Sequence, residues 1–137
     1  MLQARVATCA LDHYAKKVSK GGKPKDDSEW TGYAAIVAER ATYFCVVSCP
    51  TGTKCTDPRN EGCILHDTHA EVLARRGVVR VLWLELGQQQ KNETNDDECS
   101  LLEESDNGHF QLRSDIQLHL YISDSPCGDA SIYQVDT

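Results

Sequence analysis

With 137 residues, 40% of them apolar, the chain can form at most one domain with a modest core. Its net charge of −7 argues at first against a nucleic-acid partner, because phosphate contacts need Lys and Arg. No apolar stretch is long enough for a transmembrane span and the first residues form no secretory signal, so we expect an intracellular protein of the nucleus or cytoplasm.

Charge is unevenly distributed along the chain. Residues 92–109 contain seven acidic residues and no Lys or Arg, so the charge of this segment alone equals the net charge of the chain. A lysine cluster lies near the start of the chain, at Lys16, Lys17, Lys20, Lys23 and Lys25. Such a run is most often a solvated surface, but local patches matter more for binding than the sum, so an RNA contact stays open.

The seven cysteines are odd in number and follow no framework spacing, which predicts mostly free thiols with one or two as metal ligands. One alternative is a structural zinc module, whose ligands would be Cys49, Cys55, Cys63 and His66. Their spacings fit no strong zinc pattern, which makes this alternative weak.

The first half of the chain predicts a helix and a hairpin. Apolar residues recur at helical spacing over residues 2–18, and Gly and Pro in 19–28 then predict a loop. Two β-rich runs, 33–38 and 43–48, flank a short turn and predict a hairpin. The long connection over 49–66 is of a kind that is often functional.

The second half predicts a helix, an acidic segment and a strand. Residues 69–86 form the best helical pattern, with Thr68 as N-cap and Gly87 as C-cap. Its apolar residues share one broad face, which consists of Val72, Val79, Leu82, Trp83 and Leu86. We expect an acidic, flexible insertion over 88–112 and, from strict alternation, a strand over 115–122. The element order predicts an α/β fold with helices packed on a sheet.

Two short segments carry the chemistry, His69-Ala70-Glu71 and Pro126-Cys127. H-x-E followed by P-C-x-x-C is the pattern of zinc nucleobase deaminases, although Ala130 stands where that pattern has its second Cys. An imidazole and a thiolate can hold zinc, and the nearby carboxylate can move protons at the water that zinc activates. Three protein ligands plus water are usual at a catalytic zinc, and His69 and Cys127 would supply two of them.

Simpler explanations exist for each of these residues. Thr68 and Glu71 match the capping box T-x-x-E, in which the carboxylate only satisfies a backbone N–H. A lone Cys such as Cys127 is usually a small core residue, and a His at a helix start can be merely exposed. The joint placement of a helix start and a strand end favours the metal site.

Three motifs resemble the A-to-I editing adenosine deaminase domain family, which comprises the adenosine deaminases acting on RNA and their tRNA-specific relative. These motifs lie at 51–55 (TGTKC), 67–76 (DTHAEVLARR) and 121–132 (YISDSPCGDASI). The resemblance is closest to the tRNA-specific branch and covers nearly the whole chain, excepting the insertion.

The resemblance implies a cytidine-deaminase-like α/β/α layered mixed sheet, of which residues 1–137 would be the N-terminal part. It also implies zinc-dependent hydrolysis of adenosine to inosine in RNA. The tRNA branch acts on the adenosine 3′ of the anticodon in alanine tRNA. We therefore expect RNA, and in particular tRNA, as the partner, with no membrane and no obligate protein partner.

The resemblance also assigns roles to individual residues. His69 and Cys127 match zinc ligands, and Glu71 matches the proton donor. Arg75 and Arg76 match an arginine pair that binds inositol hexakisphosphate. A surface basic pair on a helix is the alternative, but we favour the cofactor because guanidinium forks suit phosphate oxygens. Thr53 and Lys54 match a loop that approaches the substrate nucleotide, where a Lys can meet a phosphate or simply be solvated.

The family also explains Ala130, because its third zinc ligand is a Cys some tens of residues further along. No such residue is present in this sequence. We therefore expect a truncated product that is inactive or unstable by itself, since a two-ligand zinc site is weak. The alternative hypothesis is a non-catalytic accessory or RNA-binding fragment of the same family.

Overall fold

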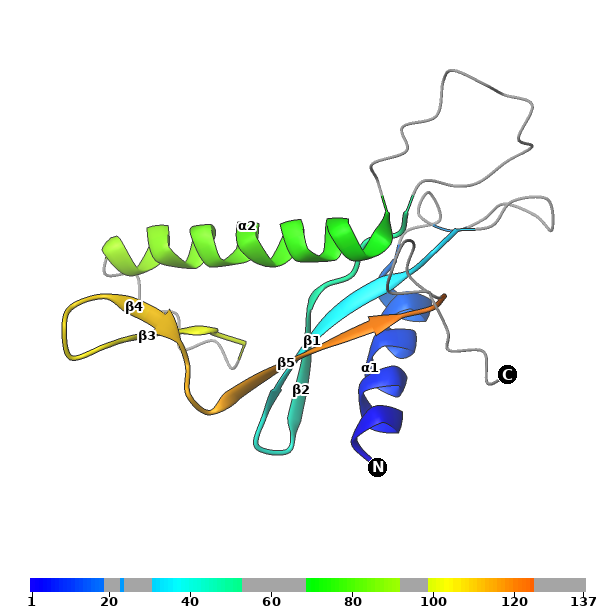
Figure 1. The fold of residues 1–137 in the computed structure, drawn as a ribbon, viewed down its shortest axis with the longest axis horizontal. Coiled ribbons are helices and arrows are strands. Elements are labelled where there is room, and N and C mark those ends of the chain that lie inside the picture. Colours follow the sequence, from blue (N-terminus) through cyan, green and yellow to red (C-terminus); the bar gives the residue numbers. More distant parts are fainter. Residues whose placement is uncertain (19–22, 24–30, 53–68, 92–98, 125–137) are drawn as a thin grey trace, which may run out of the picture.

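The computed structural model describes residues 1–18, 23, 31–52, 69–91 and 99–124 (Figure 1). The elements in chain order are α1 (Leu2–Lys17), β1 (Ala34–Arg40), β2 (Tyr43–Ser48), α2 (Ala70–Gln90), β3 (Leu102–Glu104), β4 (Phe110–Leu112) and β5 (Ile116–Ile122). This order confirms the α/β fold predicted from the sequence. Within the described ranges, no helix is long and apolar enough to cross a membrane.

The main sheet has three strands in the order β2-β1-β5, and β1 is antiparallel to both neighbours. The predicted hairpin is confirmed, but its turn lies at Ala41 and Thr42 because pairing continues to Arg40 and Tyr43. Since β2 and β5 both run against β1, they end at the edge of the sheet where β1 begins. This edge is called the site end below.

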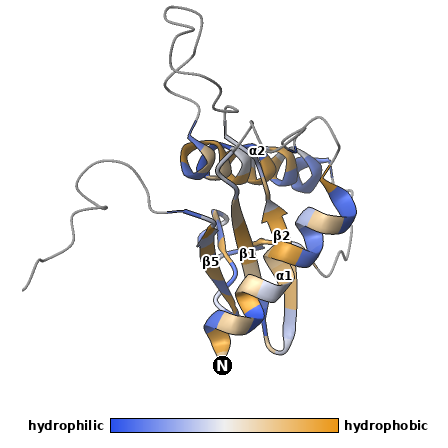
Figure 2. Cartoon of the chain, turned by 90° about the vertical axis from the view of Figure 1, so that its right-hand side faces the viewer, coloured by the Kyte–Doolittle hydropathy of each residue, from blue (hydrophilic) through white to orange (hydrophobic). Residues whose placement is uncertain are grey.

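The two helices cover opposite faces of the sheet. On one face, Val6 and Ala10 of α1 are buried in a cluster with Ala35 and Val37 of β1. On the other face, Ala70 and Ala74 of α2 pack with Ala34. Successive side chains of a strand point to opposite sides, so these clusters define an α/β/α arrangement. Figure 2 shows the central strands as mostly hydrophobic ribbons between the helices.

Small residues form the face of α2 that packs on the sheet. A Cβ added at Gly77 would lie 2.1 Å from the Ser48 hydroxyl oxygen, which shows how closely the helix approaches β2. The predicted broad apolar face is therefore wrong for three of its five members. Val72, Val79 and Trp83 are all exposed, and the Trp83 side chain is 70% accessible. Leu82 does lie against the core.

The α2 helix is also longer than its sequence pattern predicts. It continues through Gly87 and ends with Lys91 as C-cap, so the predicted C-cap at Gly87 is wrong. The N-cap is His69, whereas Thr68 lies outside the described residues. Helical hydrogen bonding carries the chain past Gly87, where the space that a Cβ would occupy is open.

Part of the segment predicted to be flexible is regular. Residues 88–90 belong to α2, and β3 and β4 form a hairpin. Leu101 is fully buried against Ala38 and Ile116, and Cys99 forms a disulfide with Cys45 of β2. The expectation of free thiols is thus wrong for this pair. Composition could not reveal these contacts, because they depend on residues distant in the sequence, 54 positions apart in the case of the disulfide.

The predicted strand over 115–122 is confirmed as β5, but its apolar face is only partly covered. Ile116 is buried and Ile122 packs against the core near α2, whereas Leu118 and Leu120 are exposed. The reason is the position of α2, which packs over β1 and β2. Alternation predicts which residues share a face, but it does not predict which of them a helix covers.

Candidate active site at one end of the sheet

The first turn of α2 carries two of the predicted site residues. His69 is the exposed N-cap, and its carbonyl accepts a hydrogen bond from the Leu73 N–H at 3.0 Å. Glu71 is half-buried in the first helical turn. The positive end of the helix dipole favours a carboxylate at this place. An imidazole and a carboxylate are thereby held two residues apart at a helix N-terminus.

The capping-box alternative for Glu71 does not match the helix start. With His69 as N-cap, Glu71 is the second helical residue, whereas the capping box needs the third. Among the described residues, the Glu71 side chain has no hydrogen bond or ion pair. Its carboxylate is therefore available for another role.

Gly32 and Tyr33 lie just before β1. They contact or closely approach residues in each of the three editase-like motifs. The Gly52 N–H donates to the Gly32 carbonyl at 2.9 Å. The Tyr33 N–H donates to the Ser123 hydroxyl at 2.8 Å, and the Ser123 N–H donates back to the Tyr33 carbonyl at 2.8 Å. On the α2 side, a Cβ added at Gly32 would lie 3.8 Å from the Cβ of Ala70.

These contacts bring the flanks of the predicted site residues together at the site end. Gly52 directly precedes Thr53 and Lys54, Ala70 directly follows His69, and Ser123 lies four residues before Cys127. Four residues span roughly 13 Å at most. Thr53, Lys54 and Cys127 themselves lie outside the described residues, so their roles stay predictions.

The described residues do not by themselves form a metal site. No group of three His, Cys, Asp or Glu side chains within these ranges could hold a metal ion. Of the two predicted zinc ligands, only His69 is described. Cys49, from the alternative zinc module, is partly buried, and burial raises the pKa of its thiol. The other three members of that module lie outside the described residues.

Arg75 and Arg76 lie on the part of α2 that is exposed. They line an open groove of about 380 Å³ together with Val79, Arg80 and Trp83. Three guanidinium groups beside an indole ring form a donor set that fits a polyphosphate. The sequence prediction does not include Arg80 and Trp83, although their spacing of four and seven residues from Arg76 places them on the same helical surface.

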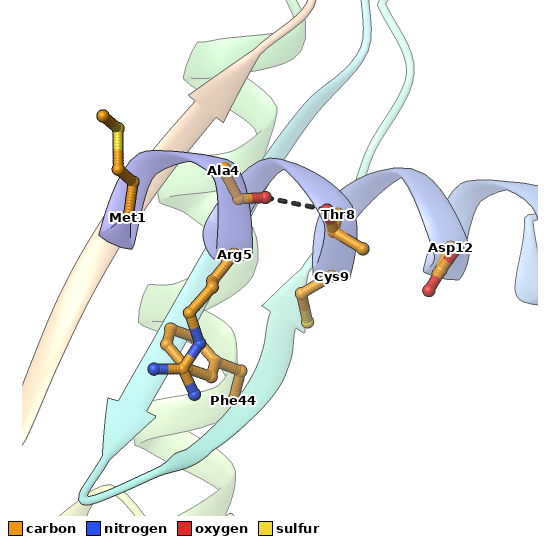
Figure 3. A pocket seen from close by; sticks show the side chains of 7 residues that line it. All are labelled: Met1, Ala4, Arg5, Thr8, Cys9, Asp12 and Phe44. Carbon is orange, nitrogen blue, oxygen red and sulfur yellow. Dashed lines mark hydrogen bonds between the residues drawn. The ribbon is translucent and has the colours of Figure 1, made fainter.

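A second pocket lies at the opposite end of the sheet (Figure 3). It has a volume of about 390 Å³ between α1 and β2, and Met1, Arg5, Cys9 and Phe44 are among the residues that line it. Arg5 reaches the turn between β1 and β2, because its guanidinium donates to the Thr42 carbonyl at 3.2 Å. None of the predicted site residues lines this pocket, which leaves the site end as the candidate active site.

Residues 48–137 match the family described as the adenosine-deaminase (editase) domain. This match covers more than half of the chain and includes the HAE and PC segments. The chain belongs to this family. The resemblance found in the motifs is thereby confirmed.

Two kinds of relative share this editase domain. The tRNA-specific adenosine deaminase 1 of Schizosaccharomyces pombe is 41% identical over 93% of this chain and 34% of its own length. The human protein of the same name is 37% identical over 93% of this chain and 28% of its own. The double-stranded RNA-specific editase Adar of Drosophila melanogaster is 34% identical over 73% of this chain and 16% of its own. The chain thus spans about a third of the tRNA-specific relatives.

Proposed function

We propose that this chain carries the first part of an active site for zinc-dependent deamination of adenosine to inosine in RNA. The proposed substrate is tRNA, and in particular the adenosine 3′ of the anticodon in alanine tRNA. The observation that supports this most directly is the convergence at Gly32 and Tyr33, which holds the flanks of three editase motifs at one end of the sheet.

The reaction needs a metal, a residue that carries protons, and residues that bind the nucleotide. His69 and Cys127, together with a third ligand, would hold zinc, which would supply hydroxide near neutral pH by lowering the pKa of a bound water molecule. Glu71 takes up the proton of the water and delivers protons to the ring nitrogen and to the departing amine. Water and adenosine become inosine and ammonia. Thr53 and Lys54 hold the substrate nucleotide.

We propose inositol hexakisphosphate as a structural cofactor at Arg75 and Arg76. The exposed guanidinium groups and the open groove beside them support this assignment, because planar forks bind phosphate oxygens in pairs. The groove lies on α2, the helix that also presents His69 and Glu71. A bound polyanion there would neutralise neighbouring cations and hold this helix in place.

Measurements of zinc content and inosine formation in the same preparation would test this proposal. Because the third zinc ligand is not in this sequence, we expect little zinc and little inosine formation from the chain alone, and the inosine formed in alanine tRNA should follow the fraction of chains that hold zinc. Glu71→Ala should keep zinc and tRNA affinity while it abolishes inosine formation, and His69→Ala should lose both zinc and inosine formation. Inosine formation that survives Glu71→Ala would contradict the proposed role of the carboxylate.

The alternative proposal is a non-catalytic RNA-binding role. Exposed cations on α1 and α2 favour it, since they can contact phosphates without any chemistry. The same measurements separate the two proposals. A zinc-loaded preparation that binds alanine tRNA and forms no inosine, with or without Glu71, would favour the binding role.

A further inference from the structure

The C-terminal end of α1 carries a group of cations. Lys16 and Lys17 lie in its last turn and are exposed. The Lys23 ammonium returns to the same end, where it lies 5.0 Å from the centre of the Tyr14 ring and donates to the Ala15 carbonyl at 3.3 Å. We call Lys16, Lys17 and Lys23 the lysine end of α1. In the described part of the chain, no ion pair involves any of the three.

The lysine end adjoins the candidate active site. The Tyr14 ring that contacts Lys23 lies 4.9 Å from the Tyr33 ring, measured between centroids. Tyr33 exchanges two hydrogen bonds with Ser123 and follows Gly32, which approaches Ala70. The ring and hydrogen-bond contacts in this series are direct, and its last step is the close approach of the Gly32 backbone to Ala70. The lysines are therefore at the same end of the sheet as the start of α2 and the end of β5.

At the opposite end of α1, by contrast, the cationic side chain makes contacts within the fold. Arg5, eleven residues before Lys16 and so about 16 Å away along the helix, lies over the Phe44 ring, 4.5 Å from its centroid (Figure 3). It also donates to the Thr42 carbonyl at 3.2 Å. This guanidinium already has partners within the fold. The lysines in the last turn do complement the helix dipole, but that role does not need three cations beside the active site.

We propose that the lysine end of α1 binds the phosphate backbone of the RNA substrate next to the reacting nucleotide. This inference rests on the proposed function and extends it to a surface. Phosphate contacts from lysines fix the register of a nucleic acid without reading its sequence, and they act locally even on a chain with a net charge of −7. The lysines thereby orient the RNA toward the start of α2.

Two double variants of the 137-residue chain provide the test. The first is Lys16→Gln with Lys17→Gln. The control is Arg5→Gln with Lys91→Gln, which removes the same charge from exposed residues elsewhere. The affinity for an alanine tRNA transcript would be measured against KCl concentration, with circular dichroism to confirm folding. A third variant, Lys16→Arg with Lys17→Arg, retains the charge.

We expect the first variant to bind at least about tenfold more weakly near 50 mM KCl, with a salt slope lower by about 1.4 to 1.8, because each lost phosphate contact removes about 0.7 to 0.9. The control and the arginine variant should stay close to the wild type. Equal losses in the first variant and the control would overturn the lysine proposal and leave the proposed function standing. An absence of tRNA binding by the wild type would contradict the RNA partner itself.

Discussion

The two ends of the main sheet are built from different interactions. At the site end, backbone and hydroxyl hydrogen bonds around Gly32 and Tyr33 hold the motif flanks together. At the other end, a disulfide and charged side chains attach the β3–β4 hairpin to β2 and to α2. The contrast teaches that main-chain and hydroxyl hydrogen bonds fix the site end, whereas a disulfide and the Glu85 carboxylate fix the hairpin end.

The largest expected effect concerns the disulfide between Cys45 and Cys99. In the chain-entropy description, a bond across a separation of 54 residues stabilises the fold by about 4 kcal/mol. Cys45→Ser with Cys99→Ser should lower the free energy of unfolding by about that amount in urea titrations. Wild type with a reductant should show the same loss. Equal urea midpoints for the oxidised wild type and the double variant would contradict this assignment.

Glu85 should have the next largest effect. Its carboxylate accepts hydrogen bonds from the Leu101 N–H at 3.0 Å, from the Leu102 N–H at 3.0 Å and from the Ser100 hydroxyl. Glu85→Ala leaves these donors without an acceptor and should cost about 2 to 3 kcal/mol. Glu104→Ala, at an exposed position of β3, is the control and should change stability by less than about 0.5 kcal/mol. Similar losses in both variants would contradict the role of Glu85.

Two glycines of α2 should respond in opposite directions. Gly77→Ala places a methyl group 2.1 Å from the hydroxyl oxygen and 3.0 Å from the Cβ of Ser48, so α2 or the Ser48 side chain must move and stability should fall by about 1 to 3 kcal/mol. Nothing lies within 4 Å of a Cβ added at Gly87, so Gly87→Ala should stabilise the helix by up to about 1 kcal/mol. Thermal unfolding of both variants gives the comparison. A gain in stability for Gly77→Ala would contradict the close packing of α2 on β2.

The smallest effect concerns the exposed Asp115. Hydrogen bonds from Arg113 and from Arg40 lower the pKa of this carboxyl group below its usual range. A lowered pKa in the folded state means that ionised Asp115 contributes stability above the unfolded pKa and loses it as the pH falls through the folded value. The melting temperatures of wild type and Asp115→Asn should therefore differ slightly at pH 7 and converge near pH 2. A difference that grows on acidification would contradict this direction.

Local patterns predicted the elements of the fold well. The hairpin over 33–48 and the strand over 115–122 follow from β-branched residues and alternation, and both are confirmed. The buried face of α2 could not be predicted from the largest apolar residues. Ala70, Ala74 and Gly77 face the sheet because small residues allow α2 to approach it closely. Trp83 is left exposed.

Contacts between residues distant in the sequence explain the remaining differences between the predicted and the observed structure. Composition predicted a flexible segment over 88–112, yet Leu101 is buried in the described part of it and Cys99 is bonded to Cys45. In the candidate site, the pattern predicted His69 and Glu71 at a helix start, which the structure confirms. It did not reveal that Gly32 and Tyr33 connect the motif flanks, because these residues carry no chemistry of their own.

Cobalt binding, with Co²⁺ in place of zinc, tests the central claim most directly. The charge-transfer absorption of a cobalt–thiolate bond reports a Cys ligand, and millimolar cobalt compensates for weak affinity. We predict an absorption that His69→Ala weakens and Cys127→Ser abolishes, whereas Cys55→Ala with Cys63→Ala leaves it unchanged. An absorption that survives Cys127→Ser and disappears in the Cys55 and Cys63 variant would contradict the editase site and favour the structural zinc module.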